Sequence, residues 1–128
     1  MRIPLLLVAF VAALFAPSCS TEQSPEEKAK ACKALAADVK GVDLTTAPAK
    51  GDADQIEEVA ESLDERIGEL RDEDAHDAAI DIHLSLHAAE DALRDGDTDR
   101  AAEKMTKARA AAQKAATACG LAPADFGI

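Results

Sequence analysis

The chain has almost no aromatic residues, with three phenylalanines and neither tryptophan nor tyrosine among its 128 positions. Any core that it forms is therefore thin and aliphatic, and alanine supplies much of it. Alanine is the best helix former because it loses no side-chain entropy in a helix. The composition predicts an all-α fold.

Common catalytic motifs and a basic surface are also missing. The sequence contains no Gly-x-Ser-x-Gly and no glycine-rich phosphate loop. Fourteen basic residues stand against 25 acidic ones, for a net charge of −11, so no basic stripe is present to displace the counterions of a nucleic acid. We therefore expect a non-enzymatic protein. It should have no cofactor, and it should not bind nucleic acid.

The only long apolar run lies at the N-terminus. It extends from Ile3 to Phe15, follows a single cation at Arg2, and leads into small residues before Cys19. As a helix this run reaches about 20 Å, which is short of the roughly 30 Å hydrocarbon core of a membrane. The pattern is typical of a signal peptide over residues 1–18 that is removed after export, and an uncleaved anchor is the alternative.

Two kinds of cleavage fit the end of this segment. Ala16 and Ser18 satisfy the small-x-small rule of ordinary signal peptidase, which predicts a secreted protein. Ser18-Cys19 resembles the end of a bacterial lipobox, with Ala16 in the place where lipoboxes usually carry leucine. The resemblance implies lipidation of Cys19, a flexible tether over residues 19–24, and anchoring to the outer face of the cell membrane.

The number of cysteines favours the lipidated form. The chain has three, and an odd thiol in an exported protein is a liability unless something consumes it. Lipidation would consume Cys19 and leave Cys32 and Cys119 to pair as a disulfide. The net charge without the leader is more negative still, so we expect the lipid to be the only contact with the membrane.

Helix signals divide residues 25–120 into four segments, and residues 121–128 form a C-terminal tail. Apolar residues recur at steps of three and four within the segments, as expected for helices that bury one face. The predicted helices cover residues 25–40, 52–71, 73–95 and 98–119. The phase slips near Asp72, where we place a turn; a single bent helix across that point is the alternative.

These helices predict a small up-down bundle with one disulfide, built of four helices or of three plus a short one. Cys32 lies on the apolar stripe of the first helix and Cys119 on that of the last. Alternating helices bring the end of the fourth beside the start of the first. The topology therefore predicts a Cys32–Cys119 disulfide.

Three histidines on the third predicted helix suggest a metal site. His76, His83 and His87 lie at offsets that bring them within about 40° of one line on the helix, and Glu90 falls close to it. The His83-x-x-x-His87 spacing suits a divalent metal. The other interpretation is that these histidines cover the flank of the bundle, since the line runs along the edge of the core.

Two further patterns lie around the turn after the third helix. Asp95, Asp97 and Asp99 alternate like the start of a calcium loop, but Thr106 stands where the bidentate glutamate belongs, which favours a solvated turn that caps the fourth helix. The stretch Leu93–Ala108 resembles the second half of a tetratricopeptide repeat. That resemblance implies close antiparallel packing of the third and fourth helices.

As a whole, the chain resembles the small alanine- and acid-rich lipoproteins of high-GC bacteria. We expect an exported, lipid-anchored, non-catalytic helical module of the cell envelope that binds an envelope protein or has a structural role. The alternative is an extracytoplasmic protein that binds a divalent metal through its histidines.

Overall fold

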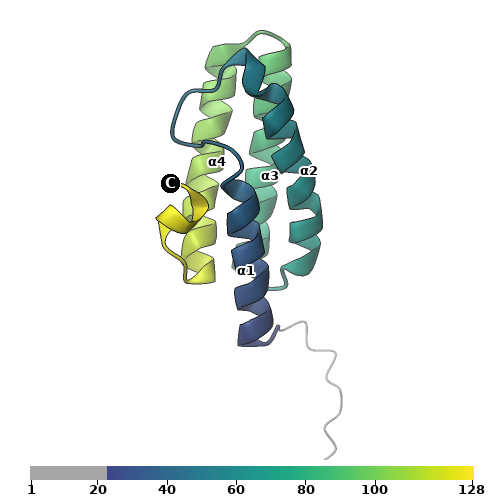
Figure 1. The fold of residues 1–128 in the computed structure, drawn as a ribbon, viewed down its shortest axis with the longest axis vertical. Helices are drawn as coiled ribbons and strands as arrows, with labels where there is room; N and C mark the ends of the chain where they lie inside the picture. The colour runs from purple at the N-terminus through teal and green to yellow at the C-terminus, as the bar shows by residue number, and fades with distance from the viewer. Residues whose placement is uncertain (1–22) are drawn as a thin grey trace, which may run out of the picture.

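The computed structural model describes residues 23–128, which form a four-helix bundle (Figure 1). Its elements are α1 (Pro25–Val39), η1 (Lys50–Asp52), α2 (Ala53–Glu69), α3 (Glu73–Arg94), α4 (Thr98–Cys119) and η2 (Pro123–Phe126), where η1 and η2 are short 3-10 helices. The predicted all-α up-down bundle is confirmed. The signal peptide, Cys19 and most of the predicted tether lie outside the described residues.

The helix ends follow local capping chemistry. Ser24 caps α1 by accepting a hydrogen bond from the Glu27 N–H, and Pro25 occupies the first turn, where its missing N–H costs nothing. Between α2 and α3 the backbone is extended at Leu70, and Asp72 caps α3 by accepting from the Ala75 N–H at 3.0 Å. The turn predicted near Asp72 is therefore confirmed, and the single bent helix is excluded.

The Asp72 carboxylate also joins α3 to α1. It accepts a hydrogen bond from Lys28 Nζ at 2.9 Å. The Lys28 ammonium, together with the N–H of Ala75, lowers the pKa of Asp72. The contact joins the first turn of α1 to the N-cap of α3.

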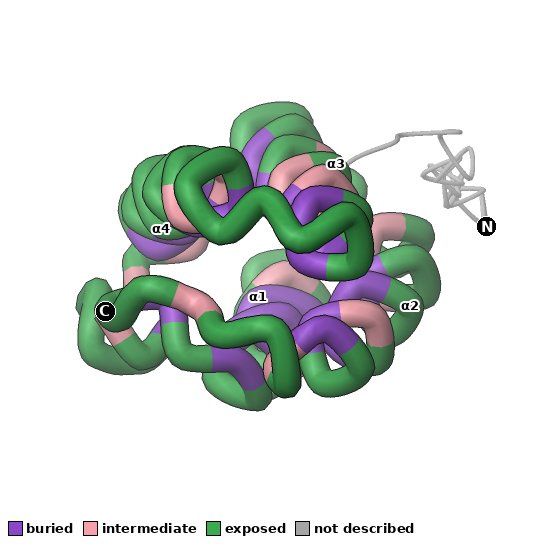
Figure 2. Tube along the Cα trace, turned by 90° about the horizontal axis from the view of Figure 1, so that it is seen from above, coloured by how far each residue is buried: buried purple, intermediate pink, exposed green. Residues whose placement is uncertain are grey.

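Alanine packing dominates the contact between α3 and α4, which is the most extensive helix pair of the bundle. These two helices form one layer, and α1 and α2 form the other (Figure 2). Small side chains allow helix axes to approach closely. The fully buried alanines of this pair are Ala75, Ala79 and Ala89 on α3 and Ala101, Ala108, Ala112 and Ala115 on α4.

A disulfide between Cys32 and Cys119 joins α1 to the last residue of α4, as the helix phases predicted. The two Cα atoms are 5.7 Å apart, and 87 positions separate the cysteines in sequence. α1 packs on α4 far less than α3 does, so the covalent bond fixes an edge of the bundle that has few contacts.

Removal of the disulfide should destabilise the fold strongly. In the chain-entropy model, a closed loop of this size contributes about 4 to 5 kcal/mol to the free energy of unfolding. We expect the Cys32→Ser/Cys119→Ser variant to melt at least about 10 °C below the unchanged protein in a calorimetric scan. A difference within about 2 °C would contradict this role.

The core continues beyond residue 120, where sequence analysis placed the end of the bundle. Residues 121–128, expected as a tail, form η2 and return the chain onto α1 and α4. Phe126 in this segment is fully buried and is the largest of the fully buried side chains. The segment is too short to show a helical period, so its sequence gave no sign that it packs.

Truncation of Phe126 tests how much this segment contributes. A buried phenylalanine cut to alanine costs about 3 to 5 kcal/mol, because the apolar contact is lost and a cavity remains. We expect Phe126→Ala to lower the urea midpoint strongly without changing the slope of the transition. Ala124→Ser, at an exposed position of the same segment, is the control and should unfold like the unchanged protein.

Candidate functional site

His83 connects α3 to α2 through a hydrogen bond from Nδ1, and its other ring nitrogen also faces α2. Nδ1 lies 2.8 Å from the Ala60 carbonyl oxygen, and Nε2 lies 3.2 Å from Asp64 Oδ1. Because a carbonyl oxygen only accepts hydrogen bonds, Nδ1 carries the hydrogen. The side chain is 14% exposed. His83 thus acts as a link between two helices.

His87 and Glu90 continue this line along α3. The rings of His83 and His87 meet edge to face, with centroids 4.5 Å apart. His87 Nδ1 lies 3.5 Å from Glu90 Oε2. Glu90, 7% exposed, is the only charged residue that is buried in the described chain. The polar groups at this edge of the core therefore contact one another.

Arg94 neutralises the buried carboxylate and ends the line. Its Nε donates to Glu90 Oε1 at 2.8 Å, and its Nη2 reaches Glu57 at 2.7 Å and Asp54 at 3.2 Å on α2. Hydrogen bonds to Glu90 and then to Asp54 raise the pKa of Arg94 above its ordinary value. We call this polar line the α2–α3 seam; its members are Asp54, Glu57, Ala60, Asp64, His83, His87, Glu90 and Arg94.

The structure brings together only part of the candidate metal set. His83, His87 and Glu90 follow one another in the seam, whereas His76 lies near its neighbour Asp77, at 3.6 Å. Within residues 23–128, no group of three or more histidine, cysteine or acidic side chains is arranged to hold a metal ion. A metal at His83 would have to displace the contacts that this ring makes with α2.

Zinc titration separates the two interpretations of the histidines. If the histidines only join α2 to α3, we expect no heat of binding at micromolar zinc. We also expect His83→Ala to lower the free energy of unfolding by about 1 to 2 kcal/mol, because a partly buried hydrogen bond is lost. His76→Ala, at a more exposed site, should change it by less than about 0.5 kcal/mol. Zinc binding that disappears in both His83→Ala and His87→Ala would instead establish the metal site.

The charges of the bundle are divided between its helices, which the net charge alone did not reveal. α2 carries seven acidic residues and one arginine, and α3 carries six acidic residues and one arginine. α4 reverses the balance with five basic and two acidic residues, and α1 has three of each. Most of the negative charge therefore lies on α2 and α3, which lie side by side (Figure 2).

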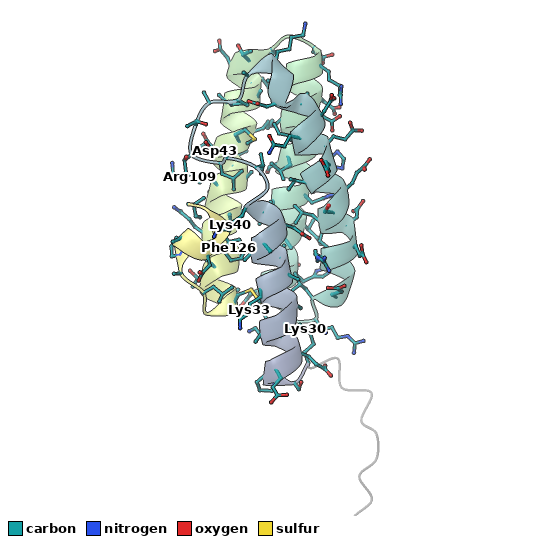
Figure 3. All side chains as sticks on the ribbon, in the orientation of Figure 1. Lys30, Lys33, Lys40, Asp43, Arg109 and Phe126 are labelled. Atoms are coloured by element: carbon teal, nitrogen blue, oxygen red, sulfur yellow. A yellow bond between two sulfur atoms is a disulfide. The ribbon has the colours of Figure 1, made fainter. Side chains whose placement is uncertain are left out.

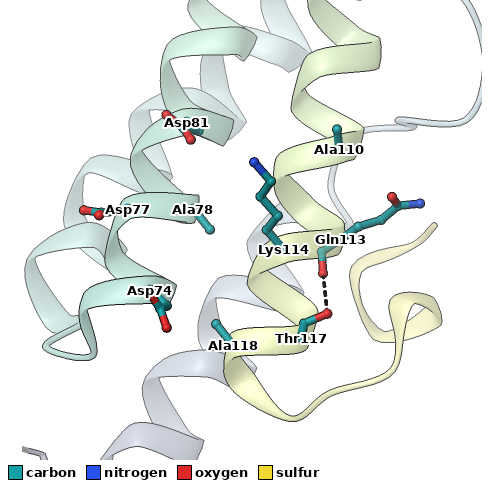
Figure 4. A pocket seen from close by; sticks show the side chains of 9 residues that line it. All are labelled: Asp74, Asp77, Ala78, Asp81, Ala110, Gln113, Lys114, Thr117 and Ala118. Atoms are coloured by element: carbon teal, nitrogen blue, oxygen red, sulfur yellow. Dashed lines mark hydrogen bonds between the residues drawn. The ribbon is translucent and has the colours of Figure 1, made fainter.

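An acidic groove lies between α3 and α4 on the outer side of their layer (Figure 4). It measures about 640 Å³, with carboxylates along the α3 wall and Lys114 as the one cation among its lining residues. Within residues 23–128, none of these carboxylates pairs with lysine or arginine. The groove is lined by Asp74, Asp77, Ala78, Asp81, Ala110, Gln113, Lys114, Thr117 and Ala118.

Leu84 extends the acidic wall beyond the groove. It follows Asp81 by three positions and therefore lies on the same face of α3. Its side chain is 59% exposed, and it is the only large hydrophobic residue exposed in the described part of the chain. The three- and four-residue spacing of this wall was visible in the sequence, but the sequence did not show that the wall faces α4.

The acidic turn before α4 has a structural role. Asp97 caps α4 by accepting a hydrogen bond from the Arg100 N–H at 3.0 Å, and Gly96 takes a positive φ of 78° in the turn. This is the cap predicted for the Asp95–Asp99 stretch.

Comparison of the chain with models of known protein families, with curated protein sequences and with solved structures gives no match in any of the three. Across residues 23–128, no helix is both long enough and apolar enough to cross a membrane.

Proposed function

We propose that this protein is an exported, lipid-anchored, non-catalytic module of the bacterial cell envelope, held at the outer face of the cell membrane through Cys19. The observation that carries the proposal is the Cys32–Cys119 disulfide. Disulfides form and persist in oxidising compartments outside the cytoplasm. The pairing of Cys32 with Cys119 leaves Cys19 as the one cysteine of the chain available for a lipid.

The point where the chain leaves the bundle suits a short anchor. Gln23 donates a hydrogen bond to the Glu69 carbonyl oxygen at 2.5 Å and accepts one from the Arg71 N–H at 3.2 Å. These bonds hold the chain against the α2–α3 turn. Four residues from Cys19 to Gln23 span at most about 14 Å, so a lipid on Cys19 would keep this end of the bundle close to the membrane.

The surface supports a binding or structural role. Exposed carboxylates on α2 and α3 give one side of the bundle a strong negative potential. Such a surface attracts cationic partners and is repelled by anionic lipid headgroups. An envelope protein with a basic face is therefore a suitable partner, and the lipid alone would hold the module to the membrane.

Mass spectrometry of the mature N-terminus tests the anchor. The full chain is expressed in a bacterium, and the protein is recovered from the membrane fraction and from the medium. We expect an N-terminal Cys19 carrying a lipid, found with the membrane. The Cys19→Ser variant should leave that fraction and yet retain its disulfide. An unmodified start at Cys19 or Thr21 would reduce the proposal to ordinary secretion.

A further inference from the structure

The exposed face of α1 carries a line of lysines. Lys30, Lys33 and Lys40, with Ala37 between the last two, follow the helical spacing of three, four and three residues, and all four are exposed (Figure 3). Within residues 23–128, none of the three lysines forms an ion pair. We call this line the cationic ridge. It lies on α1, in the layer opposite the two helices that form the acidic groove (Figure 2), and its residues Lys33, Ala37 and Lys40 border a shallow hollow between α1 and η2.

The wall of the groove repeats the spacing of the ridge. Asp74, Asp77, Asp81 and Leu84 also lie three, four and three positions apart. Since α1 and α3 run in the same direction and α-helices rise equally per residue, the two lines have the same length and pitch. The spacing of residues along the cationic ridge therefore equals the spacing along the groove wall.

The two lines also begin within about one helical turn of the same level. Lys28 Nζ contacts Asp72 at 2.9 Å, and because a lysine side chain is about as long as one helical turn, this contact keeps the two positions within about one turn of each other along the bundle axis. Two residues further along each helix come Lys30 and Asp74, followed by Lys33 and Asp77. A second copy that is displaced sideways, with a shift of at most about one turn along the axis, therefore brings each of these lysines to the level of an aspartate.

We propose that copies of this chain stack side by side, with the cationic ridge of one copy seated in the acidic groove of the next. Ala37 and the groove alanines Ala78 and Ala110 let the helices approach closely, and Leu84 is covered by the stem of Lys40. The two surfaces lie on opposite layers, so the contact is head to tail and the array is open-ended. The folded domain makes this contact itself, so it does not depend on the lipid.

The stack is weak and sensitive to salt. Each chain is strongly negative, so copies repel one another at long range, but screening over about 8 Å at physiological ionic strength leaves mainly the facing groups to interact. Exposed ion pairs contribute little individually. We expect a dissociation constant on the order of 0.1 mM at low salt, weakened about tenfold when salt is raised to about 0.5 M.

Sedimentation velocity tests the stack with the soluble chain that begins at Ser20, because residues 23–128 contain the whole core. The weight-average mass should rise past that of a dimer as the concentration approaches about 1 mM. Lys30→Glu/Lys33→Glu/Lys40→Glu and Asp74→Lys/Asp77→Lys/Asp81→Lys should each be monomeric. An equimolar mixture of the two variants should associate again, because both reversed surfaces are complementary.

A matched variant controls for total charge. Glu58→Lys/Glu61→Lys/Glu65→Lys changes the net charge as much as the groove variant does, on an exposed face of α2 outside both surfaces. It should stack at least as strongly as the unchanged chain, and circular dichroism confirms that each variant is folded. An unchanged chain that stays monomeric at about 1 mM, a mass that stops at a dimer, or a mixture that fails to associate would each overturn the proposal.

The same variants distinguish self-stacking from the binding of a different protein in the groove. If the unchanged chain stays monomeric but binds a lysine-rich peptide, and the groove variant does not bind it, the groove serves another cationic protein and self-stacking is wrong.

Discussion

The bond between Cys32 and Cys119 holds the first helix on a hairpin that makes most of the packing contacts. α3 and α4 lie against each other along their whole length through alanine side chains, and α2 packs on α3. α1 has fewer contacts with its neighbours. The disulfide, the Lys28–Asp72 ion pair and the packing of η2 hold it in position. The level of α1 relative to α3, on which the match between ridge and groove depends, follows from these links.

Scarcity of bulky side chains explains why such links are needed. Burial of apolar area is the main favourable term in folding, and alanine contributes little area per residue. Phe126 is the only phenylalanine among the described residues, which hold no tyrosine or tryptophan, and its segment packs on both α1 and α4. A covalent bond and one large side chain together stabilise an edge that alanine cannot fill.

The sequence predicted the features that depend on local rules. Capping residues and helical period placed the four helices within a few residues, and the phase of Cys32 and Cys119 predicted their pairing. Phe126 was missed because a short 3-10 segment has no period. The α2–α3 seam was found only in part, since His83 and His87 share a helix face, but their partners Ala60 and Asp64 come from another helix whose position the sequence does not give. The ridge and groove were missed for the same reason.

The disulfide also makes most of the polypeptide a closed ring. Every position between Cys32 and Cys119 lies within that ring, including the irregular segment between α1 and η1, which is largely exposed. One cut by a protease in this segment opens the ring but separates no fragment, because the two pieces stay joined through sulfur. The protein therefore stays in one piece after a break that would divide a chain without the bond.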